Sequence, residues 1–169
     1  MKEKSFYFLL VTMLSLFITG CFADPIQEDL EDYVNNGIIP LVPDEEEILG
    51  LYESVTGHNY SDDYVLYNTI QFDILPKYQD FIQKLEAIRP STSEVREIHE
   101  IYIKASNEQY SAMVLILDAI DYQDHGLIND ANNQLNEARS LFRTFQYELQ
   151  DLLDEHNLEM EELEELAQH

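Results

Sequence analysis

The sequence predicts an all-α protein, an antiparallel bundle of three long helices with two short helices packed from the N-terminal side. Three observations support this fold class. Apolar residues recur three and four positions apart over long stretches, as they do on the buried face of a helix. Capping residues and helix breakers lie where these stretches begin and end. No stretch shows convincing two-residue alternation, so no strand is expected.

The two short helices come first. Asp24-Pro25 provides an N-cap and a first-turn proline, and Asn35-Asn36-Gly37 is expected to stop the first helix. An apolar connector with two prolines, residues 38–43, should separate it from a second helix that starts at residues 44–47 and ends at Thr56-Gly57. The inner faces of the two helices are formed by Ile26, Leu30, Tyr33 and Val34, and by Ile48, Leu51, Tyr52 and Val55.

The first long helix is predicted over residues 61–89, with Ser61 as its cap and Pro90 as its end. Pro76 removes one backbone donor from this helix, so a kink or a short break is expected near residues 73–75. Helical spacing nevertheless continues through Val65, Leu66, Ile70, Ile74, Tyr78, Phe81, Ile82, Leu85 and Ile88.

Two more long helices are predicted over residues 92–123 and 127–155. Ser91-Thr92-Ser93-Glu94 fits a capping box at the start of the first of them. The second has an apolar seam over three heptads, and its expected partner is the preceding helix, antiparallel across a short turn. The seam consists of Ala131, Leu135, Ala138, Phe142, Phe145, Leu149 and Leu152.

The N-terminal segment is typical of an export signal. A basic start leads into an apolar run, Phe6–Ile18, and small Gly20 precedes Cys21, the only cysteine of the chain. This arrangement resembles the lipobox of bacterial lipoproteins, in which the cysteine becomes the mature N-terminus and carries the lipid. The alternatives are an ordinary buried cysteine behind a plain signal peptide, or an uncleaved anchor.

The lipobox interpretation sets the predicted domain organisation. Residues 1–20 are a signal peptide, residues 21–24 the lipidated cysteine and a short tether, 25–157 the helical bundle domain and 158–169 an acidic tail. The protein is expected at the extracytoplasmic face of the bacterial cell membrane, held by acyl chains such as palmitate on Cys21.

The charge is strongly one-sided. Residues 21–169 keep seven of the nine basic residues and 33 of the 34 acidic residues, a formal charge of −26. All seven basic residues lie between Lys77 and Arg143. Such a chain repels nucleic acid and favours cations and basic partners, although acidity also serves simply to keep an exported protein soluble.

The sequence lacks the residue patterns of the enzyme classes that we considered. There is no carboxylate three residues before any histidine, no His-Glu-x-x-His, no Gly-x-Ser-x-Gly, no phosphate loop, no dinucleotide fingerprint and no EF-hand loop. We therefore expect no catalytic residues, no enzyme activity and no cofactor.

Two groups of residues are candidate binding sites. Tyr60, Tyr64 and Tyr67, next to Asp62 and Asp63, are a candidate aromatic and acidic site for a cationic group, with core-rim tyrosines as the alternative. The second group, Asp118, Asp121 and His125, falls on one helix face at i, i+3 and i+7. It is a candidate site for zinc or a hard cation, with a solvated face as the alternative.

Three segments are similar to a known group of proteins. They are Tyr52–Asp63, Ile74–Tyr78 and Ile98–Tyr102. Over about residues 45–157 the chain resembles small helical lipoproteins of Firmicutes, such as Bacillus, whose function is not established. That resemblance implies an extracytoplasmic helical bundle and no known catalytic residues.

These observations predict a non-enzymatic, lipid-anchored interaction module. Its partner is expected to be an envelope protein or a basic peptide. The alternatives are an immunity or exclusion lipoprotein that binds a cationic toxin or a phage component, and a lipoprotein that binds a metal or a cationic ligand.

Overall fold

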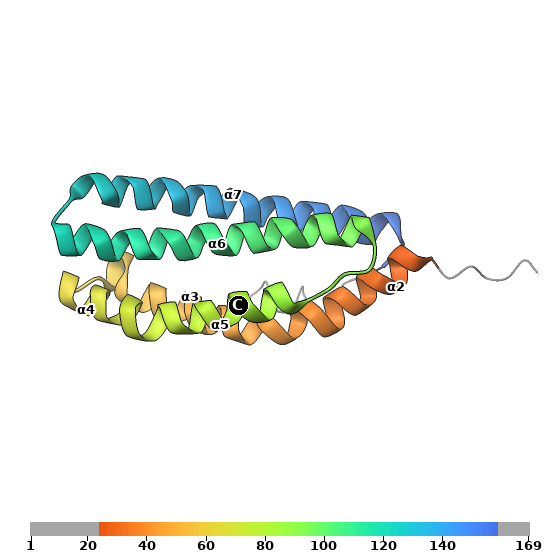
Figure 1. Cartoon of the computed structure of the whole chain (residues 1–169), viewed down its shortest axis with the longest axis horizontal. Coiled ribbons are helices and arrows are strands. Elements are labelled where there is room, and N and C mark those ends of the chain that lie inside the picture. The colour runs from red at the N-terminus through yellow and green to blue at the C-terminus, as the bar shows by residue number, and fades with distance from the viewer. Residues whose placement is uncertain (1–23, 159–169) are drawn as a thin grey trace, which may run out of the picture.

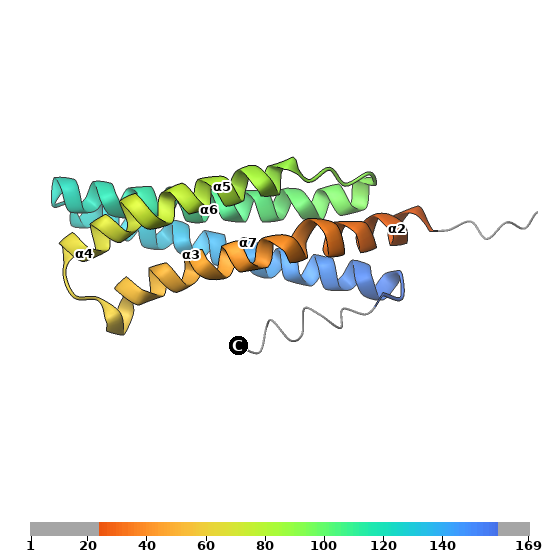
Figure 2. The same ribbon diagram turned by 90° about the horizontal axis from the view of Figure 1, so that it is seen from below.

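The computed structural model describes residues 24–158, and these residues form an all-α bundle of four antiparallel helical rods (Figure 1). The first rod, residues 25–55, contains α2 (Pro25–Asp32) and α3 (Val42–Val55). The second rod, residues 63–87, contains α4 (Asp63–Asn68) and α5 (Leu75–Ala87). The unbroken helices α6 (Ser93–Tyr122) and α7 (His125–Glu155) follow. The α6–α7 pair packs as one layer on the two rods, and no strand occurs among these residues (Figures 1 and 2).

The first rod corrects the prediction of two short helices separated by a connector. A π turn, Tyr33–Ile38, and a 3₁₀ turn, Ile39–Leu41, join α2 to α3 without a break. Gly37 does not stop the helix. A Cβ atom there would lie 3.3 Å from two side-chain carbons of Ile88, so this glycine lets the loop after α5 pack closely.

The second rod repeats this solution around Pro76. A π turn, Thr69–Ile74, ends two residues before the proline, as the π turn of the first rod ends two residues before Pro40. In both rods the residue before the proline donates its N–H to a carbonyl five positions back, Ile39 to Val34 and Leu75 to Ile70. A proline lacks a donor and clashes with the carbonyl four positions back, and the wider π turn accommodates both effects.

The helices α6 and α7 lie close to their predicted bounds. Gln123, in the left-handed region with φ of 54°, ends α6, and the carboxylate of Asp124 caps α7 by accepting the N–H of Gly126 at 2.7 Å. The predicted seam faces α6 as expected, except that Leu153 replaces Leu152 at its buried end. A straight helix drifts by about 20° per heptad, so the buried stripe moves to the next residue.

The core runs along the whole bundle. Burying each large apolar side chain contributes about 1.5–3 kcal/mol, and this packing has to stabilise a domain without a disulfide. The largest apolar side chains with less than 2% of their surface exposed are Phe81, Leu30, Ile48, Ile70, Ile74, Leu85, Met113 and Val95.

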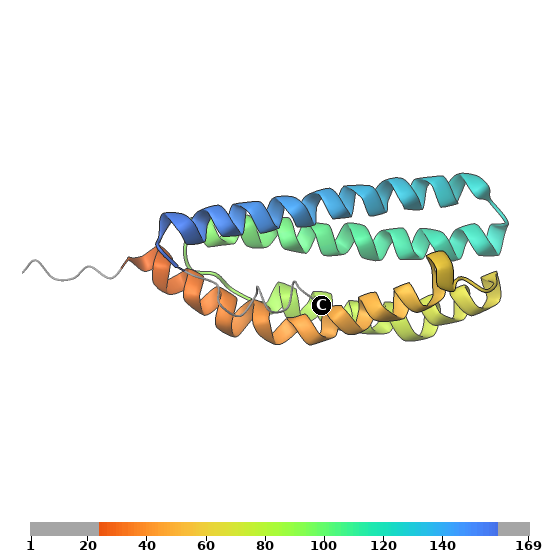
Figure 3. The same cartoon turned by 180° about the vertical axis from the view of Figure 1, so that it is seen from behind.

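One end of the bundle, here called the base, is formed by residues 24–33, 88–99 and 152–158 (Figure 3). Buried Asp29 of α2 reaches the start of α6. Its Oδ1 accepts the N–H and the hydroxyl of Ser91 at 2.9 and 2.8 Å, and its Oδ2 accepts those of Thr92 at 2.8 and 2.6 Å. Burial alone would raise the pKa of Asp29, but these four hydrogen bonds outweigh it and hold the pKa below its ordinary value.

The Asp29 carboxylate also corrects the predicted capping box. Thr92 is the N-cap residue of α6, but its side chain makes no capping bond because its hydroxyl donates to Asp29. The N–H and hydroxyl groups of Ser91 and Thr92, just before α6, are thus bound by a residue 62 and 63 positions earlier in the chain.

Two more polar contacts join elements at the base. Tyr33 Oη and His99 Nδ1 lie 3.3 Å apart, both side chains are buried, and the rings meet edge to face. His156 Nδ1 lies 2.5 Å from Oδ2 of Asp24, the N-cap of α2, so the first and last helical segments meet there.

Candidate functional site

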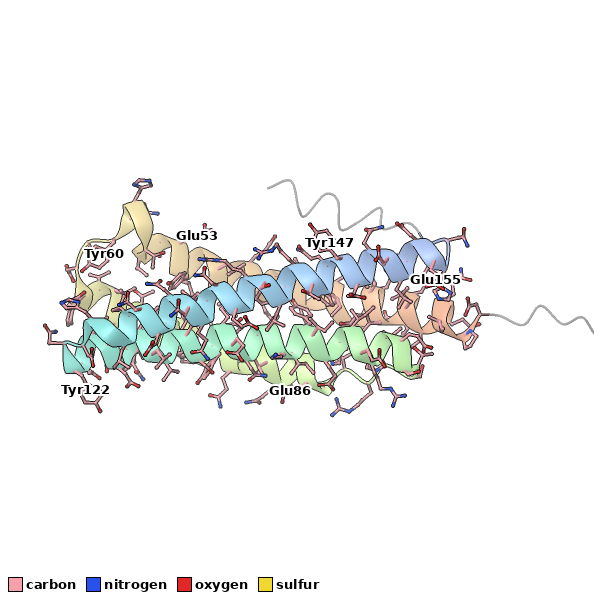
Figure 4. The ribbon with its side chains drawn as sticks, turned by 90° about the horizontal axis from the view of Figure 1, so that it is seen from above. Glu53, Tyr60, Glu86, Tyr122, Tyr147 and Glu155 are labelled. Carbon is pink, nitrogen blue, oxygen red and sulfur yellow. The ribbon has the colours of Figure 1, made fainter. Side chains whose placement is uncertain are left out.

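Both predicted groups of site residues lie at the end of the bundle opposite the base. This end, here called the tip, consists of residues 56–69 and 115–130 (Figure 4). The loop before α4 and the turn between α6 and α7 both lie there. Tyr67 of α4 donates its hydroxyl to Oδ2 of Asp121 of α6 at 3.2 Å, so the structure joins two groups that the sequence presented separately.

The first group is organised around the start of α4. Asp62, and not the predicted Ser61, is the N-cap, and its Oδ1 accepts the N–H of Val65 at 2.9 Å. Tyr60 donates its hydroxyl to Oδ1 of Asp63 at 2.8 Å. The hydrogen bonds to Asp63 and Asp121 raise the pKa values of Tyr60 and Tyr67. Both phenols therefore stay neutral at physiological pH.

The second group does not have the geometry assumed for a metal site. The helix that carries Asp118 and Asp121 ends at Tyr122, and His125 begins the next helix, so the three residues do not share a helix face. Among residues 24–158 no three histidine, aspartate or glutamate side chains are arranged to hold a metal ion. Asp121 contacts Tyr67 instead.

The tip is rich in exposed aromatic groups. Four of the seven exposed large hydrophobic side chains in the described part of the chain belong to it: Tyr60, Tyr64, Val65 and Tyr122. Tyr64 and Tyr122 are 78% and 74% exposed, so neither ring closes the rim of the core. Tyr122 was absent from the predicted site. Its signal in the sequence was an aromatic side chain off the apolar face of its helix, one residue after Asp121.

The charge of the tip has one sign. Neither of its two segments contains a lysine or an arginine, whereas they contain six aspartates: Asp62, Asp63, Asp118, Asp121, Asp124 and Asp130. The ion pairs of the described lysines lie elsewhere, between α3 and α5 or within α5, as in Lys77–Glu47 at 2.8 Å and Lys84–Asp44 at 2.9 Å. The tip thus combines uncompensated carboxylates with exposed phenol rings.

The predictions for residues 1–20, for lipidation of Cys21 and for the tail from residue 159 lie outside the described residues. No helix in residues 24–158 is both long and apolar enough to cross a membrane.

Comparison of the chain with protein-family models, with curated proteins and with solved structures finds no match. The resemblance to small helical lipoproteins of Firmicutes therefore stays a prediction. The functional argument depends on the geometry and the chemistry of the tip.

Proposed function

We propose that this protein is a non-enzymatic, lipid-anchored interaction module that uses its tip to bind a basic segment of an envelope protein. The observation that carries the proposal is the combination at the tip of exposed tyrosines and six aspartates with no lysine or arginine. The anchor would be the lipid on Cys21, at the extracytoplasmic face of the bacterial cell membrane.

The position of the tip suits this role. Asp24 lies at the base, and Cys21 precedes it by three residues in the sequence. The tip is at the opposite end of the bundle. The 30 residues of α6 rise about 1.5 Å each, so the two ends are about 45 Å apart. A bundle that stands on its base would present the tip well beyond the lipid headgroups.

The chemistry of the tip fits lysine and arginine side chains. A cation over an exposed phenol ring is stabilised by about 0.5–1 kcal/mol per contact. Carboxylates around the rings add charge-assisted hydrogen bonds, and their summed field speeds the approach of a basic partner. Exposed aromatic rings are also the side chains that dominate protein interfaces once buried.

The test is a crosslinking pull-down from intact cells with three versions of the full-length protein. In the tip variant, Tyr64→Ser and Tyr122→Ser are combined. The matched control is Tyr147→Ser, which removes a ring that is 71% exposed on α7 but lies away from the tip (Figure 4). We expect the wild type and the control to recover the same partner, and the tip variant to lose it.

A purified assay tests the same surface directly. An arginine-rich peptide should bind the full chain more weakly as salt rises, because screening weakens exposed charge pairs. The tip variant should bind about tenfold more weakly than Tyr147→Ser, the equivalent of about 1.4 kcal/mol. Equal binding by the two variants, in cells and in this assay, would contradict the proposal.

The same tip chemistry also suits capture of a cationic toxin or a phage component. The identity of the recovered partner separates the two functions. In an immunity protein, deletion of the gene should raise sensitivity to the captured agent, and the tip variant should fail to restore protection.

A further inference from the structure

A cavity of about 530 Å³ lies between α3, α6 and α7, and apart from Thr56 all of its lining residues lie outside the tip. Cavities of roughly 300–1,000 Å³ are typical of small-molecule sites. It is lined by buried Tyr102 and Phe145 and by half-buried Glu45, Tyr52 and Phe142. Two exposed residues of opposite charge, Arg139 and Glu53, line its solvent-exposed part, here called the mouth.

Glu45 is the informative residue of this cavity. Its Oε2 accepts the hydroxyl of Tyr102 at 2.8 Å, and no basic side chain of the described residues pairs with it. Two other acidic residues of the same helix, Asp44 and Glu47, pair with Lys84 and Lys77 of α5. Glu45 thus faces a cavity with a carboxylate that lacks a countercharge.

Aromatic rings surround that carboxylate. Tyr102 stacks on Phe145 with ring centroids 4.5 Å apart, and it meets Phe142 edge to face at 5.8 Å. Tyr52 lines the same cavity from α3. A carboxylate beside several aromatic rings recognises an organic ammonium group, because the rings attract the cation and cover the carbon atoms attached to it.

We propose that this cavity binds an organic monoamine, with its ammonium group on Glu45 and its apolar body against Tyr52, Phe142 and Phe145. A cation at the mouth would meet both the guanidinium group of Arg139 and the carboxylate of Glu53, so the single ammonium group is assigned to Glu45 inside the cavity. The proposal does not depend on the function of the tip, because none of these residues belongs to it.

Calorimetry with the full chain in a non-ionic detergent tests the proposal. The probe is 2-phenylethylamine, and 2-phenylethanol and 3-phenylpropionate are its neutral and anionic counterparts. We expect the amine to bind at least about tenfold more tightly than the alcohol, as a charge-assisted hydrogen bond would require, and the anion not to bind.

Variants identify the groups responsible. Glu45→Gln keeps an oxygen acceptor for Tyr102 but removes the charge, so it should weaken amine binding about tenfold and leave the affinity for the alcohol unchanged. Glu46→Gln, on the exposed side of the same turn, is the matched control and should bind like the wild type. Arg139→Gln at the mouth should bind the amine more tightly.

Equal affinities for the amine and the alcohol, or undiminished amine binding by folded Glu45→Gln, would overturn the proposal. If Glu45→Gln does not fold, the comparison of the two probes on the wild type and on Arg139→Gln decides. No binding of the amine by the wild type at millimolar concentration would also overturn it.

Discussion

At the base of the bundle, polar side chains join elements that are far apart in the sequence, whereas at the tip most polar contacts stay within one turn of chain. Asp29 bonds to residues 62 and 63 positions away, and His156 to a residue 132 positions away. At the tip, Tyr60 bonds to Asp63, and Asp62 to Val65, each three positions away. Only Tyr67–Asp121 joins distant tip elements.

This difference separates polar groups that hold the fold together from groups that are free to contact a partner. Asp29 and Tyr33 of the base are buried, and leaving their polar groups without partners would cost free energy, so the fold requires these contacts. The tip keeps aromatic rings in water although the local chain needs none of them to form its helices. Substitutions of Asp29, of His99 and of two tip tyrosines test this contrast, and the largest effect is expected at Asp29.

Asp29→Ala should lower the free energy of unfolding by about 3 kcal/mol, because two backbone and two hydroxyl donors would lose a charged acceptor. Asp29→Asn should also be destabilising, since an amide offers only one oxygen to these four donors. Urea unfolding with an unchanged m-value measures the effect.

The control for Asp29 is Asp32→Ala. Asp32 is exposed, and its carboxylate accepts only the amide of Asn36 one turn later, so its loss should cost at most about 0.5 kcal/mol. Similar losses for the two variants would mean that the four contacts of Asp29 contribute little to closing the base.

The pH dependence of stability gives a second test of the base. Burial lowers the pKa of His99; the nearby charge of Glu100 raises it by less, and that of Arg89 lowers it further. The unfolded chain would protonate this histidine near pH 6.5, whereas the folded chain keeps it neutral to lower pH. The unfolded state therefore binds more protons in this window, and stability should fall as the pH drops below about 6.5.

Replacement of His99 should flatten that pH dependence. Tyr33→Phe combined with His99→Phe leaves no unpaired hydroxyl, and its slope of unfolding free energy between pH 7 and 5 is compared with that of Tyr33→Phe alone. An identical slope with and without His99 would refute the assignment.

The sequence predicted the second half of the fold better than the first. The helices over residues 92–123 and 127–155 were predicted within two residues of α6 and α7, because the apolar spacing along them and the turn between them are local signals. The first rod was divided wrongly, because Pro40 and Gly37 were treated as stops. In fact a π turn accommodates Pro40, as another does for Pro76 in the second rod. Gly37 is needed because its backbone packs closely against Ile88, which is distant in the sequence.

The sequence predicted the two groups of residues at the candidate site but not the contact between them. Tyr60, Tyr64 and Tyr67 were singled out together, as were Asp118 and Asp121, but their meeting depends on the lengths of the antiparallel rods and not on local sequence. The partners of Asp29 are equally distant. Its position was nevertheless visible, since it lies three residues after Ile26 and four before Tyr33, on the apolar face of its helix.

The smallest effect on stability is expected at the tip, where it sharpens the contrast. Tyr64→Ser combined with Tyr122→Ser should change the free energy of unfolding by at most about 0.5 kcal/mol, because both rings are mostly in water and their hydroxyls make no hydrogen bond within the described residues. Urea unfolding beside Asp29→Ala measures this directly. A loss above about 1 kcal/mol would make the two tyrosines part of the packing. Unchanged stability together with lost peptide binding would instead show that the base stabilises the fold and the tip binds the partner. The residues of the tip could then change with the partner without loss of stability.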